Sequence, residues 1–443
     1  MAFSGLDIYK LLPKTNCRKC GLATCLAFAM QLAKKTLPIE KCPYISAESK
    51  AILEEQALPP IKLVTLGSDD SKLELGNETV MFRHEEKFRN PAGLGFIIED
   101  NLSDIDIRKR IEKINQLKFE RVGQLLEVNL VAIKQNTDAK RFMETTRLVL
   151  SNTVLPVMLM SNDLIALRQA AAIAKSRRPL LYCATKDNFS QIAPIAKEFQ
   201  LPLVVVAQDI DTLAQLSKEL NSLGVHDLIL DTGTKSVTDK IWDLTQLRRQ
   251  ALKKSNRPLG YPSLAIVDKN DSYEEAMEAT GYIAKYAGIV LIKGVDSWEV
   301  LAILTFRQNI YTDPQKPLQI EPKLYPVGGA TEKSPVLITT NFSLSYYTVL
   351  GEVEASKIPS YILSVDTEGM SVLTAWAAEK FNAESITKSL DKFGVKDAVS
   401  HKNLIIPGYV AVLSGDLEEQ SGFKVIVGPK EAAGIPAFLK NLN

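Results

Sequence analysis

Histidine and cysteine are scarce in this chain, with 3 and 5 copies in 443 residues. The histidines, His84, His226 and His401, lie far apart, and no two have the spacing of a shared metal site. We expect each to be a solvated or hydrogen-bonded imidazole. Cys183 stands alone in the apolar run LLYCA with no histidine nearby in sequence, so we expect a core residue rather than a nucleophile.

An excess of either charge is also missing, since 53 Lys and Arg stand against 52 Asp and Glu. A chain with nearly equal positive and negative charge has no excess of positive charge to neutralise a phosphate backbone or an anionic membrane. We therefore expect neither nucleic acid nor membrane as a partner. Met1 is not followed by a signal-peptide pattern, and no apolar run reaches the length of a membrane span. The sequence therefore predicts a cytoplasmic protein of two to four domains.

The other four cysteines lie together near the start of the chain. Cys17, Cys20, Cys25 and Cys42 follow the spacing Cys-x2-Cys-x4-Cys-x16-Cys-Pro. Three thiols close together in sequence and a fourth further along the chain favour an iron-sulfur cluster of the 4Fe-4S type, although the spacing matches neither ferredoxin pattern. A structural zinc site and a disulfide pair are the alternatives.

The order of patterns predicts an α/β chain with three domains. Residues 1–58 read as the 4Fe-4S module, ending before Pro59 and Pro60. Residues 61–312 contain eight short apolar runs that alternate with helical periodicity, as in a TIM (β/α)8 barrel. The expected barrel strands begin at Thr79, Leu126, Leu155, Pro179, Leu201, Asp227, Ser263 and Ile289, with the weaker runs IKLVTL and GLGFIIE preceding or decorating the barrel.

Ligands of such barrels bind where the strands end. This rule selects Lys134, Asp231, Asp268 and Lys293, although Asp and Lys are also common in loops. After the barrel, residues 313–332 form a proline-rich linker, and residues 333–443 alternate strands and helices as a small open α/β sheet.

Two segments and this order of domains resemble a known family. The runs LLPKTNCRKCGLATC and GMSVLTAWAAEKF, together with the barrel and the terminal sheet, are similar to the large (gamma) subunit of the corrinoid iron-sulfur protein of the anaerobic acetyl-CoA pathway. The resemblance covers the whole chain. It implies that residues 333–443 form a corrinoid-binding domain and that the four cysteines hold the cluster.

The resemblance implies a methyl carrier within a corrinoid-dependent methyltransferase system. Corrinoid cobalt(I) would accept a methyl group from methyltetrahydrofolate, supplied by a partner methyltransferase, and methylcobalt would donate it to acetyl-CoA synthase. The 4Fe-4S cluster would return accidentally formed cobalt(II) to cobalt(I). The family also pairs this chain with a small corrinoid protein subunit in a heterodimer.

Residues in the segment GMSVLTAWAAEKF and elsewhere in residues 333–443 can be proposed to contact the corrinoid. The chain lacks the Asp-x-His-x-x-Gly run that supplies a histidine ligand to cobalt in many cobalamin carriers, and we expect Thr374 to lie under the metal. A helix start can offer backbone N–H groups to corrin amides or a phosphate. The expected cofactor-binding residues are Thr340, Tyr346, Gly369, Met370, Ser371, Val372, Leu373, Thr374 and Gly434.

Two other functions remain open on the residues alone. A pterin-dependent methyltransferase would bind the folate in its own barrel, and its cluster would be structural. An electron-transfer or zinc scaffold would contain no organic cofactor. Cobalt and iron together are required by the methyl carrier only.

Overall fold

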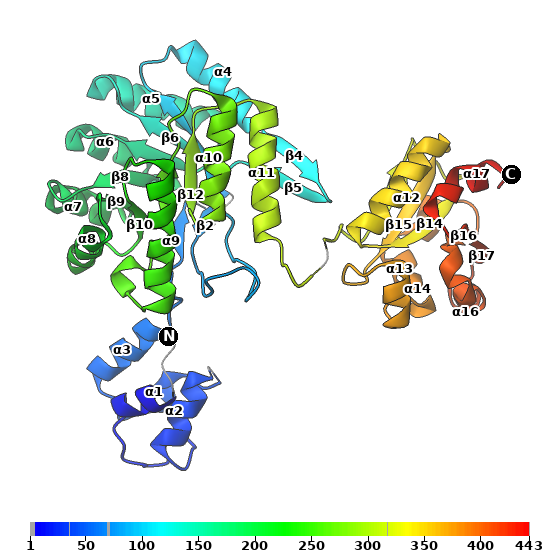
Figure 1. The fold of residues 1–443 in the computed structure, drawn as a ribbon, viewed down its shortest axis with the longest axis horizontal. Coiled ribbons are helices and arrows are strands. Elements are labelled where there is room, and N and C mark those ends of the chain that lie inside the picture. The colour runs from blue at the N-terminus through cyan, green and yellow to red at the C-terminus, as the bar shows by residue number, and fades with distance from the viewer. Residues whose placement is uncertain (1–4, 35, 69–70, 317, 443) are drawn as a thin grey trace. The chain divides into compact units, whose positions relative to one another are not determined.

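The computed structural model describes residues 5–34, 36–68, 71–316 and 318–442. The chain forms two compact units (Figure 1). Unit 1 comprises Met1–Lys118 and Glu127–Tyr311, and unit 2 comprises Phe119–Leu126 and Thr312–Asn443. In the described ranges, no helix is both long and apolar enough to cross a membrane.

Unit 1 begins with short helices packed around a small hydrophobic cluster. Thr24 and Ser46 cap two of them, with side-chain oxygens that accept backbone N–H groups of Ala27 and Ser49. Phe28 and Ala29 are the most buried members of the cluster. The elements are α1 (Gly5–Leu11), α2 (Cys25–Ala33), η1 (Ile39–Lys41) and α3 (Ala47–Ala57).

A closed barrel of eight parallel strands forms the rest of unit 1. From β3 to β10, each strand pairs with the next barrel strand along the chain; β11 pairs with β12, and the last strand, β12, pairs with the first, β3. A parallel bridge from Leu230 to Ser263 joins β10 to the start of β11 and completes the ring. The strands are β3 (Gly93–Glu99), β6 (Leu130–Lys134), β7 (Val157–Met160), β8 (Leu180–Ala184), β9 (Leu203–Val206), β10 (Leu228–Asp231), β11 (Leu264–Ile266) and β12 (Ile289–Ile292). The predicted (β/α)8 barrel is confirmed.

Helices surround the barrel, and a hairpin closes its amino end. The helices α4 to α11 lie outside the ring of strands (Figure 1). The β1–β2 hairpin packs Val64, Leu66, Leu73 and Leu75 against side chains from the starts of the barrel strands. The bounds are β1 (Val64–Leu66), β2 (Leu73–Leu75), α4 (Asp104–Asn115), α5 (Ala139–Asn152), α6 (Leu164–Ala174), α7 (Phe189–Phe199), α8 (Ile210–Ser222), α9 (Val237–Lys253), α10 (Ser272–Ala284) and α11 (Ser297–Tyr311).

One predicted barrel strand is wrong. The run at Thr79 is a loop, because the backbone N–H groups of Met81 and Phe82 donate to the Glu85 carboxylate at 3.0 and 3.1 Å instead of to a neighbouring strand. The first barrel strand is β3, the glycine-containing run GLGFIIE that we expected to precede or decorate the barrel.

Unit 2 is a five-stranded mixed sheet with helices on both faces. The strand order is β13-β15-β14-β16-β17, with β13 antiparallel to the others. The predicted open α/β sheet is confirmed, and the proline-rich segment supplies its edge strand β13. The elements are β13 (Leu324–Val327), β14 (Val336–Thr340), α12 (Ser343–Ser356), β15 (Ser360–Val365), α13 (Val372–Ala377), α14 (Ala383–Lys392), α15 (Val395–Ala398), β16 (Asn403–Ile406), η5 (Gly408–Leu413), α16 (Ser414–Ser421), β17 (Lys424–Val427), η6 (Ala432–Gly434) and α17 (Ile435–Lys440).

A hairpin from within the barrel sequence also belongs to unit 2. It consists of β4 (Lys118–Arg121) and β5 (Gln124–Glu127). Its turn residues Val122 and Gly123 have positive φ of 55° and 66°. Val122 packs against the apolar cluster on the α12 side of the sheet.

The central strands of unit 2 separate toward their carboxyl ends. β14 pairs with β15 over all five of its residues, but with β16 only at Val336↔Leu404 and Leu337↔Ile405. The chain also changes direction here, because β15 adds on one side of β14 and β16 on the other. In open α/β sheets, ligands bind at such a switch point, beyond the carboxyl ends of the strands.

Candidate functional site

A cavity of about 320 Å³ lies where β14 and β16 separate. Apolar side chains from both strands and from α12 form most of its wall, and Ser371 and Val372 reach it from the start of α13. The lining residues are Leu337, Ile338, Thr339, Phe342, Leu344, Ser345, Thr348, Val349, Ser371, Val372, Ile405, Ile406, Pro407, Tyr409, Pro429, Lys430, Ala432 and Ile435. An apolar cavity with a few hydroxyl groups is typical of an organic cofactor site.

The buried side chain of Asn341 holds the turn that leads to α13. Its Oδ1 accepts hydrogen bonds from the backbone N–H and hydroxyl of Thr367, at 2.9 and 3.0 Å, and from the Gly369 N–H at 3.0 Å. Its Nδ2 donates to Gln319 and Asp366, both at 3.3 Å. Gly369 has a φ of +74°, and an added Cβ would lie 2.5 Å from Gln319 Cγ. The geometry therefore requires glycine at this position.

The predicted residues after Gly369 divide between the cavity and the surface. Ser371 and Val372 line the cavity, and Met370 packs against the core under α13. Leu373 and Thr374 are exposed. The hydroxyl oxygens of Ser371 and Thr374 lie 2.9 Å apart, so the first turn of α13 presents two hydroxyl groups side by side.

The other three predicted residues lie outside the cavity lining. Thr340 ends β14, is fully buried, and has an Oγ1 with no hydrogen-bond partner within the described chain. Tyr346 is 5% exposed and packs against Tyr325, with ring centroids 4.8 Å apart and ring planes tilted by 50°. Gly434 packs closely on Pro429, because an added Cβ would lie 2.8 Å from Pro429 Cβ. Each of the three adjoins a lining residue without lining the cavity itself: Thr340 follows Thr339, Tyr346 follows Ser345, and Gly434 packs on Pro429.

Asn341 and much of the cavity wall were not predicted from the sequence. Asn341 and Phe342 directly follow β14, and Pro407 directly follows β16. Their position in the sequence could have identified them, because residues that directly follow the two strands at a switch point face the side of the sheet where ligands bind. Thr339 also lines the cavity, one residue before the predicted Thr340.

Three of the four N-terminal thiols share one small apolar cluster. Cys25 and Cys42 are buried members, and Cys20 packs against them while partly exposed. Cys17 is partly exposed, and the backbone N–H of Lys19 lowers the pKa of its thiol. All four are free thiols. Among the described residues, the structure brings no three Cys, His, Asp or Glu side chains into a metal-holding group.

The loop before α2 directs backbone N–H groups toward sulfur. Lys14, Asn16, Arg18 and Gly21 have positive φ of 58°, 48°, 62° and 84°. Asn16 donates its N–H to Cys25 Sγ at 3.4 Å and accepts the Cys25 N–H on Oδ1 at 2.8 Å. Concave runs of N–H groups are a feature of many anion and Fe–S sites. The donor set and this backbone fit an iron-sulfur cluster.

Each candidate residue at the barrel mouth forms an ion pair within the protein. Lys134 Nζ lies 3.1 Å from Glu99 Oε1, and Lys293 bonds to Asp268. Asp231 is buried and bonds to Lys240 at 2.5 Å and to the Tyr182 hydroxyl at 3.2 Å. These charges neutralise each other within the protein. The presence of charged side chains at the strand ends is therefore explained without a ligand.

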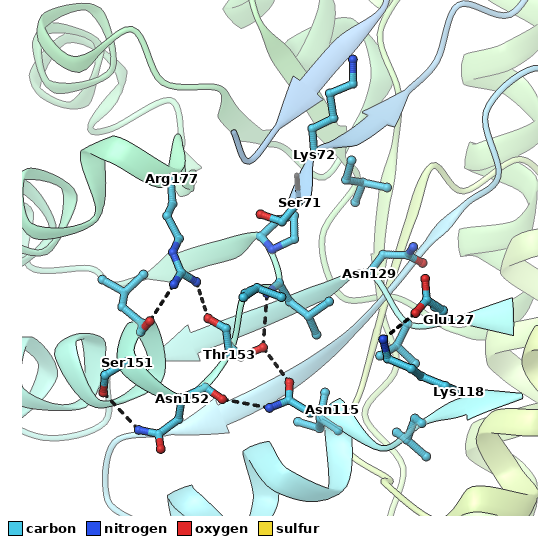
Figure 2. A pocket seen from close by; sticks show the side chains of 18 residues that line it. Ser71, Lys72, Asn115, Lys118, Glu127, Asn129, Ser151, Asn152, Thr153 and Arg177 are labelled. Carbon is cyan, nitrogen blue, oxygen red and sulfur yellow. Dashed lines mark hydrogen bonds and ion pairs between the residues drawn. The ribbon is translucent and has the colours of Figure 1, made fainter. Parts of the chain in front are cut away.

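A larger cavity, about 590 Å³, lies at the amino ends of the barrel strands (Figure 2). Its polar groups bond to one another: Asn115 donates to the Asn152 carbonyl at 2.8 Å, Thr153 donates to Asn115 at 2.7 Å, and Arg177 donates to the Leu150 carbonyl at 2.7 Å. Barrel enzymes place their chemistry at the opposite, carboxyl ends. We assign these groups to stability.

The three histidines and Cys183 have ordinary structural surroundings. His84 stacks on Phe82, His226 Nδ1 lies 3.0 Å from Asn221 Oδ1, and His401 Nε2 lies 2.9 Å from the Ser334 carbonyl oxygen. Burial raises the pKa of the Cys183 thiol to about 12, so it stays protonated and unreactive at neutral pH.

Comparisons with known proteins cover the whole chain. A family model described as CO dehydrogenase/acetyl-CoA synthase delta subunit matches residues 63–439, and a family model for an Fe-S cluster matches residues 12–44. The corrinoid/iron-sulfur protein large subunit of Moorella thermoacetica is 43% identical, with 99% of each chain covered. The acetyl-CoA decarbonylase/synthase complex subunit gamma of Methanothermobacter thermautotrophicus is 34% identical, covering 100% of this chain and 99% of the relative.

Among solved structures, dihydropteroate synthase from Vibrio fischeri ES114 superposes with a TM-score of 0.41. It is 13% identical and covers 57% of this chain and 100% of its own.

Proposed function

We infer from its membership of the family of corrinoid/iron-sulfur protein large subunits and acetyl-CoA decarbonylase/synthase gamma subunits that this chain is a methyl carrier of the acetyl-CoA pathway. The single observation that carries the proposal is the 43% identity with a corrinoid/iron-sulfur protein large subunit over 99% of both chains. A bound corrinoid supplies a cobalt centre that accepts and donates a methyl group.

We propose that the cavity between β14 and β16 and the first turn of α13 hold the corrinoid. The apolar wall excludes water, and Asn341 fixes the turn that presents the neighbouring hydroxyls of Ser371 and Thr374. Thr374 is the residue proposed to lie under the metal. The histidine of unit 2, His401, already bonds to the Ser334 carbonyl, which agrees with a cofactor held without a protein imidazole.

We propose that Cys17, Cys20, Cys25 and Cys42 hold a 4Fe-4S cluster. The residues around them provide N–H donors to sulfur and a dry wall made by Phe28 and Ala29, and both features tune cluster potential. A bound cluster supplies single electrons at a potential that in proteins extends to about −700 mV, low enough to restore the methyl-accepting state of the corrinoid.

The proposed partners follow from the same family. A small subunit would complete a heterodimer, a methyltransferase would supply the methyl group of methyltetrahydrofolate, and acetyl-CoA synthase would receive it. The names of the relatives describe a subunit of a larger assembly, which supports such partners in general terms.

The substitution Cys20→Ala tests the division of roles between the two ends of the chain. We expect the anaerobically purified variant to lose most of its iron, to keep its corrinoid, and to lose reductive reactivation of the oxidised corrinoid. Iron and cobalt per chain and the absorbance spectrum measure this. Cys183→Ala is the matched control and should keep full iron. Full iron in Cys20→Ala would refute the ligand assignment.

A further inference from the structure

The loop that carries the two partly exposed thiols contains three cationic residues and no carboxylate. No Asp or Glu occurs in the sequence between Asp7 and Glu40. Lys14, Arg18 and Lys19 lie in this loop and are exposed. Although the whole chain is almost neutral, this loop has a strongly cationic surface.

Two of these cations lie over aromatic rings, and the salt bridges among the described residues involve none of the three. The Nζ of Lys14 lies 5.7 Å from the centroid of the Tyr9 ring, and the Nζ of Lys19 lies 4.9 Å from the centroid of the Tyr44 ring. Across the described ranges, neither these lysines nor Arg18 forms an ion pair with a carboxylate. Their charge therefore remains available to a partner.

The same loop carries the two more exposed of the four thiols. Cys25 and Cys42 are 8% and 7% exposed and lie in the apolar cluster, whereas Cys17 and Cys20 are partly exposed. An electron that enters from another protein has the shortest path through the side of Cys17 and Cys20. The exposed Tyr44 and the three cations border that side.

We propose that Lys14, Arg18 and Lys19 form the docking face for an acidic electron-carrier protein that reduces the cluster. The inference rests on the proposed function, because it requires a cluster at the four thiols. One electron leaves the reduced iron-sulfur centre of the carrier, which is oxidised, and enters the cluster of this chain, which is reduced; no atom is transferred.

Charge complementarity favours this occupant. Electron-transfer complexes have small, transient interfaces, and opposite charges bring the partners together and can raise association rates tenfold or more. Three cations around exposed redox ligands match an acidic carrier. An anionic membrane or a nucleic acid would bind the positive charges, but neither would account for the exposed thiols beside them.

The test is the salt dependence of the interaction with a reduced acidic ferredoxin of the bacterial type. In the intact protein, Lys14→Glu, Arg18→Glu and Lys19→Glu are combined. We expect about a tenfold weaker Kd for ferredoxin at low salt, a tenfold slower second-order rate of cluster reduction, and a nearly flat dependence on NaCl. Iron content and reduction by photoreduced deazaflavin should be unchanged.

Reversal of three exposed lysines on barrel helices, Lys109→Glu, Lys140→Glu and Lys218→Glu, is the matched control, because it changes net charge equally. We expect wild-type ferredoxin binding in this control. Equal loss in both triple variants, or a wild-type rate independent of salt, would overturn the docking face. Tight binding of the wild type to anionic vesicles or DNA, lost with the loop charges while ferredoxin reduction is not, would also overturn it. Wild-type protein lacking iron would instead refute the cluster proposal.

Discussion

At the residue scale, Asn341 connects the end of β14 to the turn before α13. We expect Asn341→Ala to reduce corrinoid retention, because Thr367 and Gly369 lose the oxygen that accepts three of their hydrogen bonds. Leaving buried donors without a partner costs about 1–3 kcal/mol each, enough to release the turn. Cobalt per chain after gel filtration measures the effect.

Asn341→Asp retains the accepting oxygen and should keep more corrinoid than Asn341→Ala. Asn403→Ala, at an exposed position at the start of β16, is the control for loss of an asparagine in the same sheet. Equal cobalt retention in Asn341→Ala and Asn403→Ala would show that the turn does not depend on this side chain.

Glu299 makes unit 1 sensitive to pH. Its carboxyl is fully buried, and burial, followed by the neighbouring Glu275, raises its pKa to about 8. The unfolded chain releases this proton near pH 4.5, whereas the folded chain holds it until about pH 8. The stabilising contribution is therefore complete below about pH 4.5 and is lost as the pH rises to 8.

Glu299→Gln should remove this dependence. One proton corresponds to a slope of about 1.4 kcal/mol per pH unit in the free energy of unfolding, and we expect the variant to be relatively more stable than the wild type at pH 8 than at pH 5. Urea unfolding at a series of pH values provides the measurement, with the exposed Glu144→Gln as control. An unchanged pH profile in Glu299→Gln would contradict the assignment.

The sequence predicts residues whose chemistry is rare and misses those whose role comes from burial. The cysteines are few, and four of them lie close together near the start of the chain. A shared site could therefore be proposed from their spacing alone. Asn341 is a single asparagine after a strand, a common loop residue, and only its 1% exposure and its five hydrogen bonds distinguish it. Tyr346 was expected to contact the corrinoid from the edge of the sheet, but its ring lies in the core of unit 2.

At the element scale, the separation of β14 and β16 creates the proposed corrinoid cavity. Ala432→Phe should fill part of this cavity and lower the corrinoid content, because Ala432 lines it from η6. Cobalt per chain and the visible spectrum would show the loss. Ala437→Phe places the same ring at an exposed position on α17 and should leave the corrinoid content unchanged. Full cobalt in Ala432→Phe would place the cofactor elsewhere.

The barrel shows why most elements could be predicted while one strand could not. Seven strands are continuous apolar runs, and their alternation with helical segments was sufficient to predict them from the sequence. Glycine lowers the strand propensity of GLGFIIE, yet a Cβ at Gly95 would lie 2.6 Å from Leu291 Cδ2 and 3.1 Å from Leu130 Cβ. Close packing between neighbouring strands requires this glycine, and no local pattern reveals that contact.

At the scale of the whole molecule, the chain combines the thiol-bearing helices and the barrel with a separate open sheet. The order of these parts was predictable because each has its own periodicity. The assignment of Phe119–Leu126 to unit 2 could not be predicted. This hairpin interrupts the barrel sequence, and its partners lie about 200 residues later, near Ile320.

The central claim is that one polypeptide holds both a redox cluster and a corrinoid. Purification of the full chain with its partner subunit under strict exclusion of oxygen, followed by quantification of iron and cobalt, tests it most directly. We expect both metals in the same preparation, with about four iron atoms for each cobalt in keeping with a 4Fe-4S cluster. Iron without cobalt would contradict it.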